Sequence, residues 1–176
     1  MITMLEGQIS YEFSDEFSVV RLEASTYYCR HWQNFAKPDS EEGNKECDFI
    51  AFNTKTKELW LIEVKDYRGT RRTKPSSLAD EFALKCRDSI GCLYAIKLST
   101  LAQNEEKTMI SPMMDAKTIR CVLHVEQTRY NRLFPSVIDP KALRDSTKKR
   151  LRPLDPHALG GDASSLAGQV PWGITV

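Results

Sequence analysis

Two short apolar runs around a polar segment form the most informative pattern in this chain. They lie in DFIAFNTKTKELWLIEVK, residues 48–65, on either side of the polar segment 53–58. This pattern is typical of two strands joined by a turn. Because side chains alternate between the two faces of a strand, each strand presents one set of residues to a common face. The expected face consists of Asp48, Ile50 and Phe52 in the first strand and Leu59, Leu61, Glu63 and Lys65 in the second.

The register of this hairpin decides whether its acidic residues meet. A turn centred between Lys55 and Thr56 pairs residues whose numbers sum to 111, which sets Asp48 directly opposite Glu63. Directly opposed side chains have Cβ atoms roughly 4.5–5.5 Å apart, close enough for two carboxylates to share one divalent cation. A slip of one residue would turn one acid to the other face.

Periodicity elsewhere predicts further strands and helices. Strands are expected over 9–13 and 17–22, as an N-terminal hairpin, and over 118–127. A long amphipathic helix is expected over 78–98, and a basic helix begins at Asp139-Pro140 and ends at Arg152. Ser25 is a suitable cap for a short helix that carries Tyr28, Trp32 and Phe35.

The order of these elements predicts an α/β fold. A strand, a long helix and a strand favour a right-handed crossover, with strand 118–127 parallel to the strand that bears Glu63. The largely apolar strands 48–52 and 59–65 argue for helices on both faces of a mixed central sheet, with the C-terminal helix at the periphery. We expect one domain over 1–159 and a flexible tail over 160–176, because residues 160–168 are rich in Gly, Ala and Ser.

Composition narrows the classes of protein that remain. The chain has 176 residues, of which 41% are hydrophobic, with 25 basic and 24 acidic side chains. Any nucleic-acid surface is therefore a local patch on a nearly neutral molecule. Five cysteines without a CxxC pair favour reduced thiols over structural zinc or a disulfide framework. No apolar run reaches the roughly 20 residues of a membrane span, and the N-terminus lacks the features of a signal peptide. We therefore expect a cytoplasmic protein that does not enter the membrane.

The predicted acid pair has the chemistry of a site for a hard divalent cation. Mg²⁺ and Mn²⁺ prefer oxygen ligands and keep several waters, and the carboxylates of Asp48 and Glu63 with the main-chain carbonyl of Val64 would supply three such oxygens. The open positions would take a phosphate oxygen and an attacking water. Lys65 points to the same side as Glu63, where it could orient or deprotonate that water, or stabilise charge in the transition state.

This arrangement resembles the core motif of the PD-(D/E)xK nuclease superfamily, which includes restriction endonucleases and junction resolvases. The resemblance rests on Asp48, fourteen intervening residues and Glu63-Val64-Lys65, on consecutive strands followed by a helix and a strand. It implies a restriction-endonuclease-like α/β/α core and Mg²⁺- or Mn²⁺-dependent cleavage of DNA. In that family the matching acids bind the metal and the matching lysine assists hydrolysis. Many relatives act as dimers, so a homodimer is compatible with it.

The chain departs from that family pattern at two places. Cys47 stands where a proline is usual. Many members also place a further glutamate on a helix before the hairpin, whereas Glu12, Glu16 and Glu23 lie in segments that read as strands. The metal site would then be one ligand short. Two alternatives therefore stand beside a DNA nuclease: the same fold without catalysis, as a nucleic-acid-binding or protein-interaction module, and an unrelated α/β protein whose acids form a structural salt bridge.

Basic residues adjoin the predicted site. The loop after the hairpin carries Arg68, Arg71, Arg72 and Lys74, and reads either as a phosphate-binding patch or as a solvated loop. The same two alternatives apply to the basic helix that ends at Arg152. On helix 78–98, Glu81 and Lys85 would reach the acids if that helix packs beside the hairpin.

Aromatic and histidine side chains give weaker signals. Tyr27, Tyr28 and Trp32 are suited to stacking on bases, but their helical spacing favours the core. His31, His124 and His157 are widely separated, and we do not predict any of them as a metal ligand.

Overall fold

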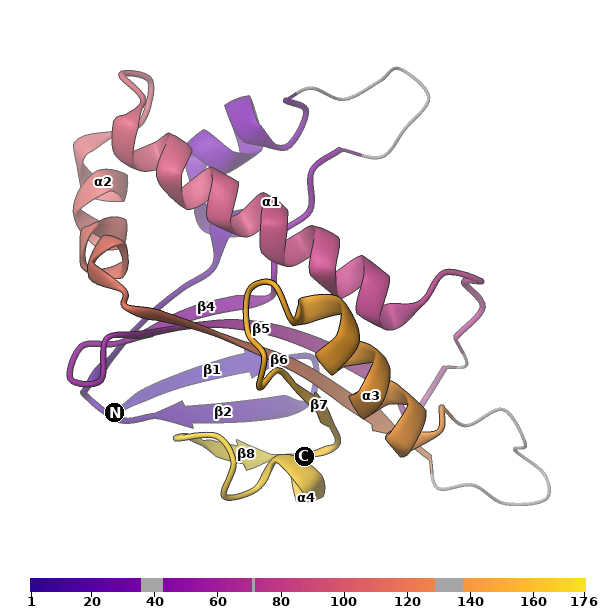
Figure 1. Ribbon diagram of the computed structural model, residues 1–176. Helices are drawn as coiled ribbons and strands as arrows, with labels where there is room; N and C mark the ends of the chain where they lie inside the picture. The colour runs from indigo at the N-terminus through magenta and orange to yellow at the C-terminus, as the bar shows by residue number, and fades with distance from the viewer. Residues whose placement is uncertain (36–42, 71, 129–137) are drawn as a thin grey trace.

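The computed structural model describes residues 1–35, 43–70, 72–128 and 138–176, and these form two β-sheets with helices (Figure 1). The larger sheet has the order β3-β4-β5-β6-β7 and is mixed: β3, β4 and β5 are antiparallel neighbours, and β5, β6 and β7 are parallel. Its strands are β3 (Phe17–Val20), β4 (Phe49–Asn53), β5 (Glu58–Tyr67), β6 (Thr118–Gln127) and β7 (Leu159–Gly161). The smaller, antiparallel sheet contains β1 (Ile2–Glu6), β2 (Ile9–Phe13) and β8 (Gly173–Thr175).

The central hairpin β4–β5 has the predicted register. Phe49 pairs with Ile62, and the ladder continues to Asn53 opposite Glu58. The turn is fixed by Asn53, whose side-chain oxygen accepts hydrogen bonds from the amides of Lys55 (2.9 Å) and Thr56 (3.0 Å). An Asn side chain that bonds its own following backbone favours a tight turn. Local turn chemistry and the alternation of apolar residues therefore agree on one register.

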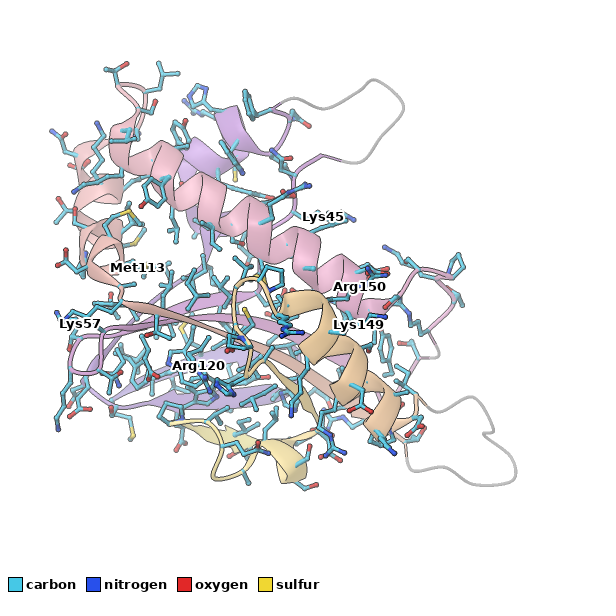
Figure 2. All side chains as sticks on the ribbon, viewed as in Figure 1. Lys45, Lys57, Met113, Arg120, Lys149 and Arg150 are labelled. Carbon is cyan, nitrogen blue, oxygen red and sulfur yellow. The ribbon has the colours of Figure 1, made fainter. Side chains whose placement is uncertain are left out.

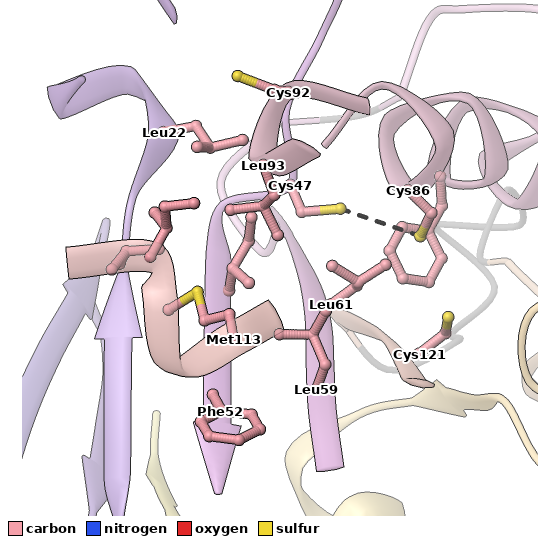
Figure 3. Packing of buried hydrophobic residues seen from close by; sticks show 14 of the residues in the cluster. Leu22, Cys47, Phe52, Leu59, Leu61, Cys86, Cys92, Leu93, Met113 and Cys121 are labelled. Carbon is pink, nitrogen blue, oxygen red and sulfur yellow. Dashed lines mark hydrogen bonds between the residues drawn. The ribbon is translucent and has the colours of Figure 1, made fainter. Parts of the chain in front are cut away.

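Helices cover one face of the larger sheet, and α1 (Leu78–Leu98) crosses it (Figure 1). Ile50, Phe52, Leu59 and Leu61 lie in a buried cluster with apolar residues of α1, as predicted for this face (Figure 3). The other helical elements are η1 (Leu22–Ala24), η2 (Tyr28–Trp32), α2 (Asn104–Ile110), η3 (Ser111–Asp115), α3 (Pro140–Leu151) and α4 (Ala163–Leu166). The β5–β6 pair, joined through α1, is parallel, as predicted.

Helix α1 is fixed from both sides. On the sheet side, the Cys47 and Cys86 sulfurs lie 3.9 Å apart (Figure 3), and the Cys47 amide donates to Ser89 (2.9 Å). On the other, Gly91 admits the Trp32 ring, since a Cβ at this position would lie 2.8 Å from a ring carbon. The glycine that weakens the helix by up to about 1 kcal/mol therefore allows close packing of η2 against it.

The opposite face of the larger sheet differs from the prediction of a second helical layer. The smaller β-sheet covers it, together with the short helix α4. Ile9, Tyr11 and Phe13 of β2 point into this interface and pack with Phe49 and Trp60. Largely apolar strands indicate that both sheet faces are buried, but they do not specify whether helices or a second sheet cover them.

The predicted N-terminal hairpin of residues 9–13 and 17–22 is wrong. The two strands lie in different sheets, because β2 pairs with β1 and β8, whereas β3 pairs with β4. The short turn at Ser14 passes the chain from one sheet to the other, with Phe13 and Phe17 both in the interface between them. The hairpin that does form at the N-terminus is β1–β2, around Gly7 with φ +58°.

The C-terminal segment 160–176 is also structured, in contrast to the predicted flexible tail. It supplies part of β7, all of α4, and β8, which pairs with β2. Trp172 is only 8% exposed and packs against Phe13 and Trp60, with ring centroids 5.2 and 5.0 Å apart. The segment therefore belongs to the core between the sheets. Within the described residues, no helix has the length and hydrophobicity required to span a membrane.

Candidate functional site

The acid pair lies where β4 begins, on the helical side of the larger sheet. Asp48 immediately precedes β4, and its Oδ2 accepts a hydrogen bond of 2.7 Å from the backbone amide of Val64. Glu63 lies in the middle of β5 and is only 2% exposed. The hairpin register thus brings Asp48 next to the segment Glu63-Val64-Lys65, as the sequence predicts.

Two lysines contact the buried carboxylate. The Lys65 ammonium forms an ion pair with Oε1 of Glu63 and lies 3.2 Å from the carbonyl oxygen of Val64. The Lys85 ammonium, which extends from α1, lies 2.7 Å from the same Oε1 and 3.8 Å from Oδ1 of Asp48. Helix α1 therefore packs beside the hairpin and delivers Lys85, the condition stated from the sequence. Glu81 does not join the site and pairs with Arg72 instead.

The pKa of Glu63 depends on two opposing effects, burial of its carboxylate and the charges of the neighbouring residues. Burial raises the pKa of Glu63, and the neighbouring Asp48 raises it further, while Lys65 and Lys85 act in the opposite direction. For Lys85, burial acts to lower the pKa, but the charges of Glu63 and Asp48 outweigh it and the pKa is raised. The two acids therefore favour the charged form of Lys85, whereas burial and the charge of Asp48 disfavour ionisation of Glu63.

One oxygen of the site is buried without a partner. Among the described residues, Oε2 of Glu63 accepts no hydrogen bond although it is inaccessible to solvent. A buried carboxylate oxygen left unpaired is costly, and a bound cation is one way to satisfy it. Two carboxylates and the Val64 carbonyl are all hard oxygen ligands, so the donor set fits Mg²⁺ or Mn²⁺.

A third acidic ligand is not found among the residues that the structure describes. Glu12 is exposed on β2, Glu16 pairs with Lys55 at 3.2 Å, and Glu23 pairs with Arg21 at 3.0 Å. In the described parts of the chain, no three His, Cys, Asp or Glu side chains are grouped so as to hold a metal ion. The upstream glutamate expected from the family pattern therefore has no counterpart among these three residues.

The basic loop after β5 is largely occupied with internal pairing. Arg68 donates to both carboxylate oxygens of Asp66 (2.9 and 2.6 Å), and Arg72 donates to Glu81 (2.8 Å) and Tyr67 (3.1 Å). Lys74 is exposed. Arg71 lies outside the described residues. Of the predicted phosphate-contacting residues that the structure describes, Lys74 alone is exposed, whereas Arg68 and Arg72 are half-buried.

Helix α3 carries an exposed basic face. It buries Leu143, Thr147 and Leu151 and turns most of its charged residues to solvent. Arg150 pairs with Asp80 of α1 at 2.5 Å, which ties α3 to the helix that carries Lys85. Figure 2 shows Arg150 and Lys149 on this helix. The exposed basic residues are Lys141, Arg144, Lys148, Lys149, Arg150 and Arg152.

The aromatic residues of η2 belong mainly to the core. Tyr27 and Tyr28 are buried, and Trp32 packs against the same cluster and donates to the carbonyl of Asp88 (3.1 Å). The Ser25 hydroxyl accepts from the Tyr28 amide (3.1 Å) just before the helical residues 26–32, as predicted, but Phe35 lies in the turn beyond this helix. His31 and His157 are exposed.

Tyr11, His124 and Glu126 form a buried polar network on the other face of the sheet, which the sequence does not predict. His124 of β6 is 0% exposed; its Nδ1 contacts the Tyr11 hydroxyl, and its Nε2 lies 2.8 Å from Glu126. Glu126 also accepts from the amide of Ala163 at the start of α4 (2.7 Å). This network joins β2, β6 and the C-terminal segment. A neutral imidazole satisfies it when Nδ1 accepts from Tyr11 and Nε2–H donates to Glu126.

We expect the free energy of unfolding to depend on pH through His124 in this polar network. Burial lowers the pKa of His124, against the opposite influence of Glu126. The unfolded chain, with a histidine pKa of about 6.5, therefore binds a proton more readily than the folded one. The free energy of unfolding should fall as pH decreases below about 6.5, by at most about 1.4 kcal/mol per pH unit from this group. Urea titrations between pH 7.5 and 5.5 should show this slope, and His124→Gln should remove it; equal slopes in both proteins would contradict the assignment.

Comparisons with known proteins leave the family open. No family model matches the sequence, and no solved structure matches it. The chain is similar to a cysteine–tRNA ligase of Neisseria meningitidis serogroup A, with 27% identity over 84% of this chain. It spans only 25% of the length of that protein. The similarity thus concerns a part of the ligase.

Proposed function

We propose that this protein is a metal-dependent phosphodiesterase that cleaves DNA at the site formed by Asp48, Glu63 and Lys65. The observation that carries the proposal is the state of Glu63: a carboxylate at 2% exposure, opposite a second acid, with one oxygen unpartnered. Charges are rarely buried in this way unless they are paired or bind a metal. A purely structural ion pair would not require Glu63 to keep one carboxylate oxygen without a partner next to a second acid, Asp48.

The fold we propose is restriction-endonuclease-like. Support comes from the order of its elements, in which the β4–β5 hairpin is followed by α1 and by β6 parallel to β5. The acids and Lys65 lie on this hairpin, on the face that α1 covers. The second layer on the other face is a sheet here, so the likeness concerns the hairpin, helix and strand.

The residues of the site have distinct proposed roles. Asp48, Glu63 and the Val64 carbonyl would hold Mg²⁺ or Mn²⁺, which, when bound, neutralises phosphate charge and lowers the pKa of a coordinated water. Lys65 contacts both Glu63 and the Val64 carbonyl, so its ammonium lies within reach of a phosphodiester placed against these oxygens. There it orients the water or stabilises the charge that develops on the phosphate.

Nucleic acid is the proposed partner because the molecule has a local basic surface on a nearly neutral chain. The exposed basic residues of α3 are on the helix that is tied to α1 by Arg150 and Asp80. Basic side chains of this kind contact phosphates and add affinity without sequence preference. The relative's name refers to tRNA, so RNA belongs in the set of substrates to be tested.

A second candidate is the same fold acting as a nucleic-acid-binding or protein-interaction module without catalysis. The observation in its favour is that the two acids are matched by two lysines, Lys65 and Lys85, with no third acid found among the described residues. A site neutralised by its own lysines is stable without a metal. In that case the protein would bind nucleic acid or a partner but would not bind Mn²⁺.

A cleavage panel separates the two candidates. Purified protein is incubated with supercoiled, linear, branched and single-stranded DNA and with tRNA, in Mg²⁺, in Mn²⁺ and in EDTA. We expect cleavage of at least one DNA substrate in the divalent ions and none in EDTA. Binding without cleavage in every condition would favour the module, and cleavage of tRNA alone would change the substrate class.

A further inference from the structure

Lys85 lies on the boundary between the acid pair and a neighbouring cleft. Its ammonium is 2.7 Å from Glu63 Oε1 and 3.8 Å from Asp48 Oδ1. The same side chain lines a cleft of about 490 Å³ between η2 and the segment before β4, together with Asn44, Lys45 and others. Figure 2 shows Lys45 beside α1. Lys85 is thus shared by the two features.

The charge of the site changes when a divalent cation binds. With both acids ionised and both lysines protonated, the formal charges of Asp48, Glu63, Lys65 and Lys85 cancel. A divalent cation would add two positive charges among ammonium groups that already contact its ligand oxygens. Because like charges at such distances repel strongly in a buried site, cation binding favours removal of one ammonium or arrival of an anion.

Lys85 is the lysine that is free to leave the acids. Lys65 is two residues from Glu63 on the same strand and also contacts the Val64 carbonyl (3.2 Å), so its backbone is part of the strand that carries the site. Lys85 instead reaches the acids from α1 through its flexible four-carbon stem. The backbone of α1 at this point is held by Cys86 against Cys47. The exchange therefore requires only a rotation of the Lys85 side chain.

The cleft is suited to a phosphate-bearing strand. Its walls are mainly polar and include Gln33, Asn34 and Asn44 besides the two lysines, which outnumber the single acid, Glu46, whose carboxylate accepts a hydrogen bond from the Tyr28 hydroxyl. Its volume lies in the range of about 300–1,000 Å³ that is usual for small-molecule sites, which is enough for a nucleotide. An ammonium and side-chain amides are the groups that contact phosphate and base edges in nucleic-acid complexes.

We infer that Lys85 exchanges partners: it neutralises Glu63 before a divalent cation binds, and then turns into the cleft and binds a phosphate beside the scissile bond. This rests on the proposed function and deepens it, since it assigns the cleft to the flanking strand of the substrate. Lys85 thereby links cation binding to substrate binding. Each event favours the other, because the cation releases the lysine that the phosphate then engages.

Two titrations test the exchange. Mn²⁺ alone is titrated calorimetrically into the wild type, Lys85→Met and Lys97→Met, the last being a matched charge change at an exposed lysine of α1 that bonds Ser111 (3.0 Å). A single-stranded DNA oligonucleotide is then titrated in Mn²⁺ into the same proteins carrying Lys65→Met, which suppresses cleavage. We expect Lys85→Met to bind Mn²⁺ about tenfold more tightly and the oligonucleotide about tenfold more weakly. Lys97→Met should change neither, and Lys85→Arg should keep the oligonucleotide affinity.

The outcomes separate this inference from the proposed function. Absence of Mn²⁺ binding to the wild type would overturn both. Binding to the wild type with equal or weaker binding to Lys85→Met would overturn the exchange alone. If Lys85→Met does not fold, the side-chain ammonium signal of Lys85 in the wild type is followed by NMR during Mg²⁺ titration, with assignment from Lys85→Arg. A signal unchanged at saturating Mg²⁺ would overturn the exchange.

Discussion

Replacing Lys65 by methionine is expected to lower metal-dependent cleavage by about 10³-fold while leaving the protein folded. The loss follows from the position of its ammonium on Glu63 and the Val64 carbonyl, where general acid–base or electrostatic catalysis contributes about 10²–10⁴-fold. The fold should tolerate the change because Lys85 still pairs with Glu63 at 2.7 Å. Cleavage rates and thermal unfolding of the same preparations provide the two measurements.

Matched variants make that result specific. Lys55→Met removes an exposed lysine from the turn of the same hairpin, where it pairs with Glu16, and should leave cleavage unchanged. Asp48→Asn and Glu63→Gln keep the shape of the acids and should lose cleavage together with Mn²⁺ binding, whereas Lys65→Met should lose cleavage but retain the ion. Full activity in Lys65→Met would refute the assigned role of this residue.

Replacing Trp172 by alanine is expected to destabilise the protein by about 3–5 kcal/mol, the usual cost of truncating a buried tryptophan. Trp172 fills the space between the sheets, against Phe13, Phe17 and Trp60. Its loss would also weaken the pairing of β8 with β2. Urea denaturation followed by circular dichroism measures the change, and Trp172→Phe should restore part of it.

A control for this prediction is Tyr94→Ala, because Tyr94 is an aromatic residue on α1 with 59% exposure. It should change the free energy of unfolding by less than about 0.5 kcal/mol. If Trp172→Ala were as mild as this control, residues 160–176 would be a dispensable tail, as composition alone suggests, and the packing described for β8 would be wrong.

The sequence contains most of the information for the hairpin and little for the pairing around it. Alternation of apolar residues and the turn at Asn53 are local features, so they determine the register that sets Asp48 opposite Glu63. The partners of β2 and β3 depend on contacts between distant segments, which hydrophobic periodicity and strand propensity do not encode. The apolar sequences of β4 and β5 likewise predict burial on both faces, but they do not predict whether helices or a second sheet cover the second face.

Three further features leave weaker traces in the sequence. Val170 and Trp172 are apolar and buried just before β8, a sign of a packed segment that the Gly-, Ala- and Ser-rich stretch before them obscures. Lys85 lies between Phe82 and Cys86 on the buried side of α1. A charged residue in such a position requires a partner, although the sequence does not identify Glu63 as that partner. His124 and Glu126 alternate on β6, but their contact with Tyr11 is nonlocal.

The most direct test of the metal site is a crystal structure with Mn²⁺, using anomalous scattering to locate the ion. The predicted result is one peak in contact with carboxylate oxygens of Asp48 and Glu63 and with the Val64 carbonyl, at about 2.0–2.3 Å, which is absent in Glu63→Gln. Saturating Mn²⁺ with no peak at these residues, and with Lys65 and Lys85 still on Glu63, would contradict the account.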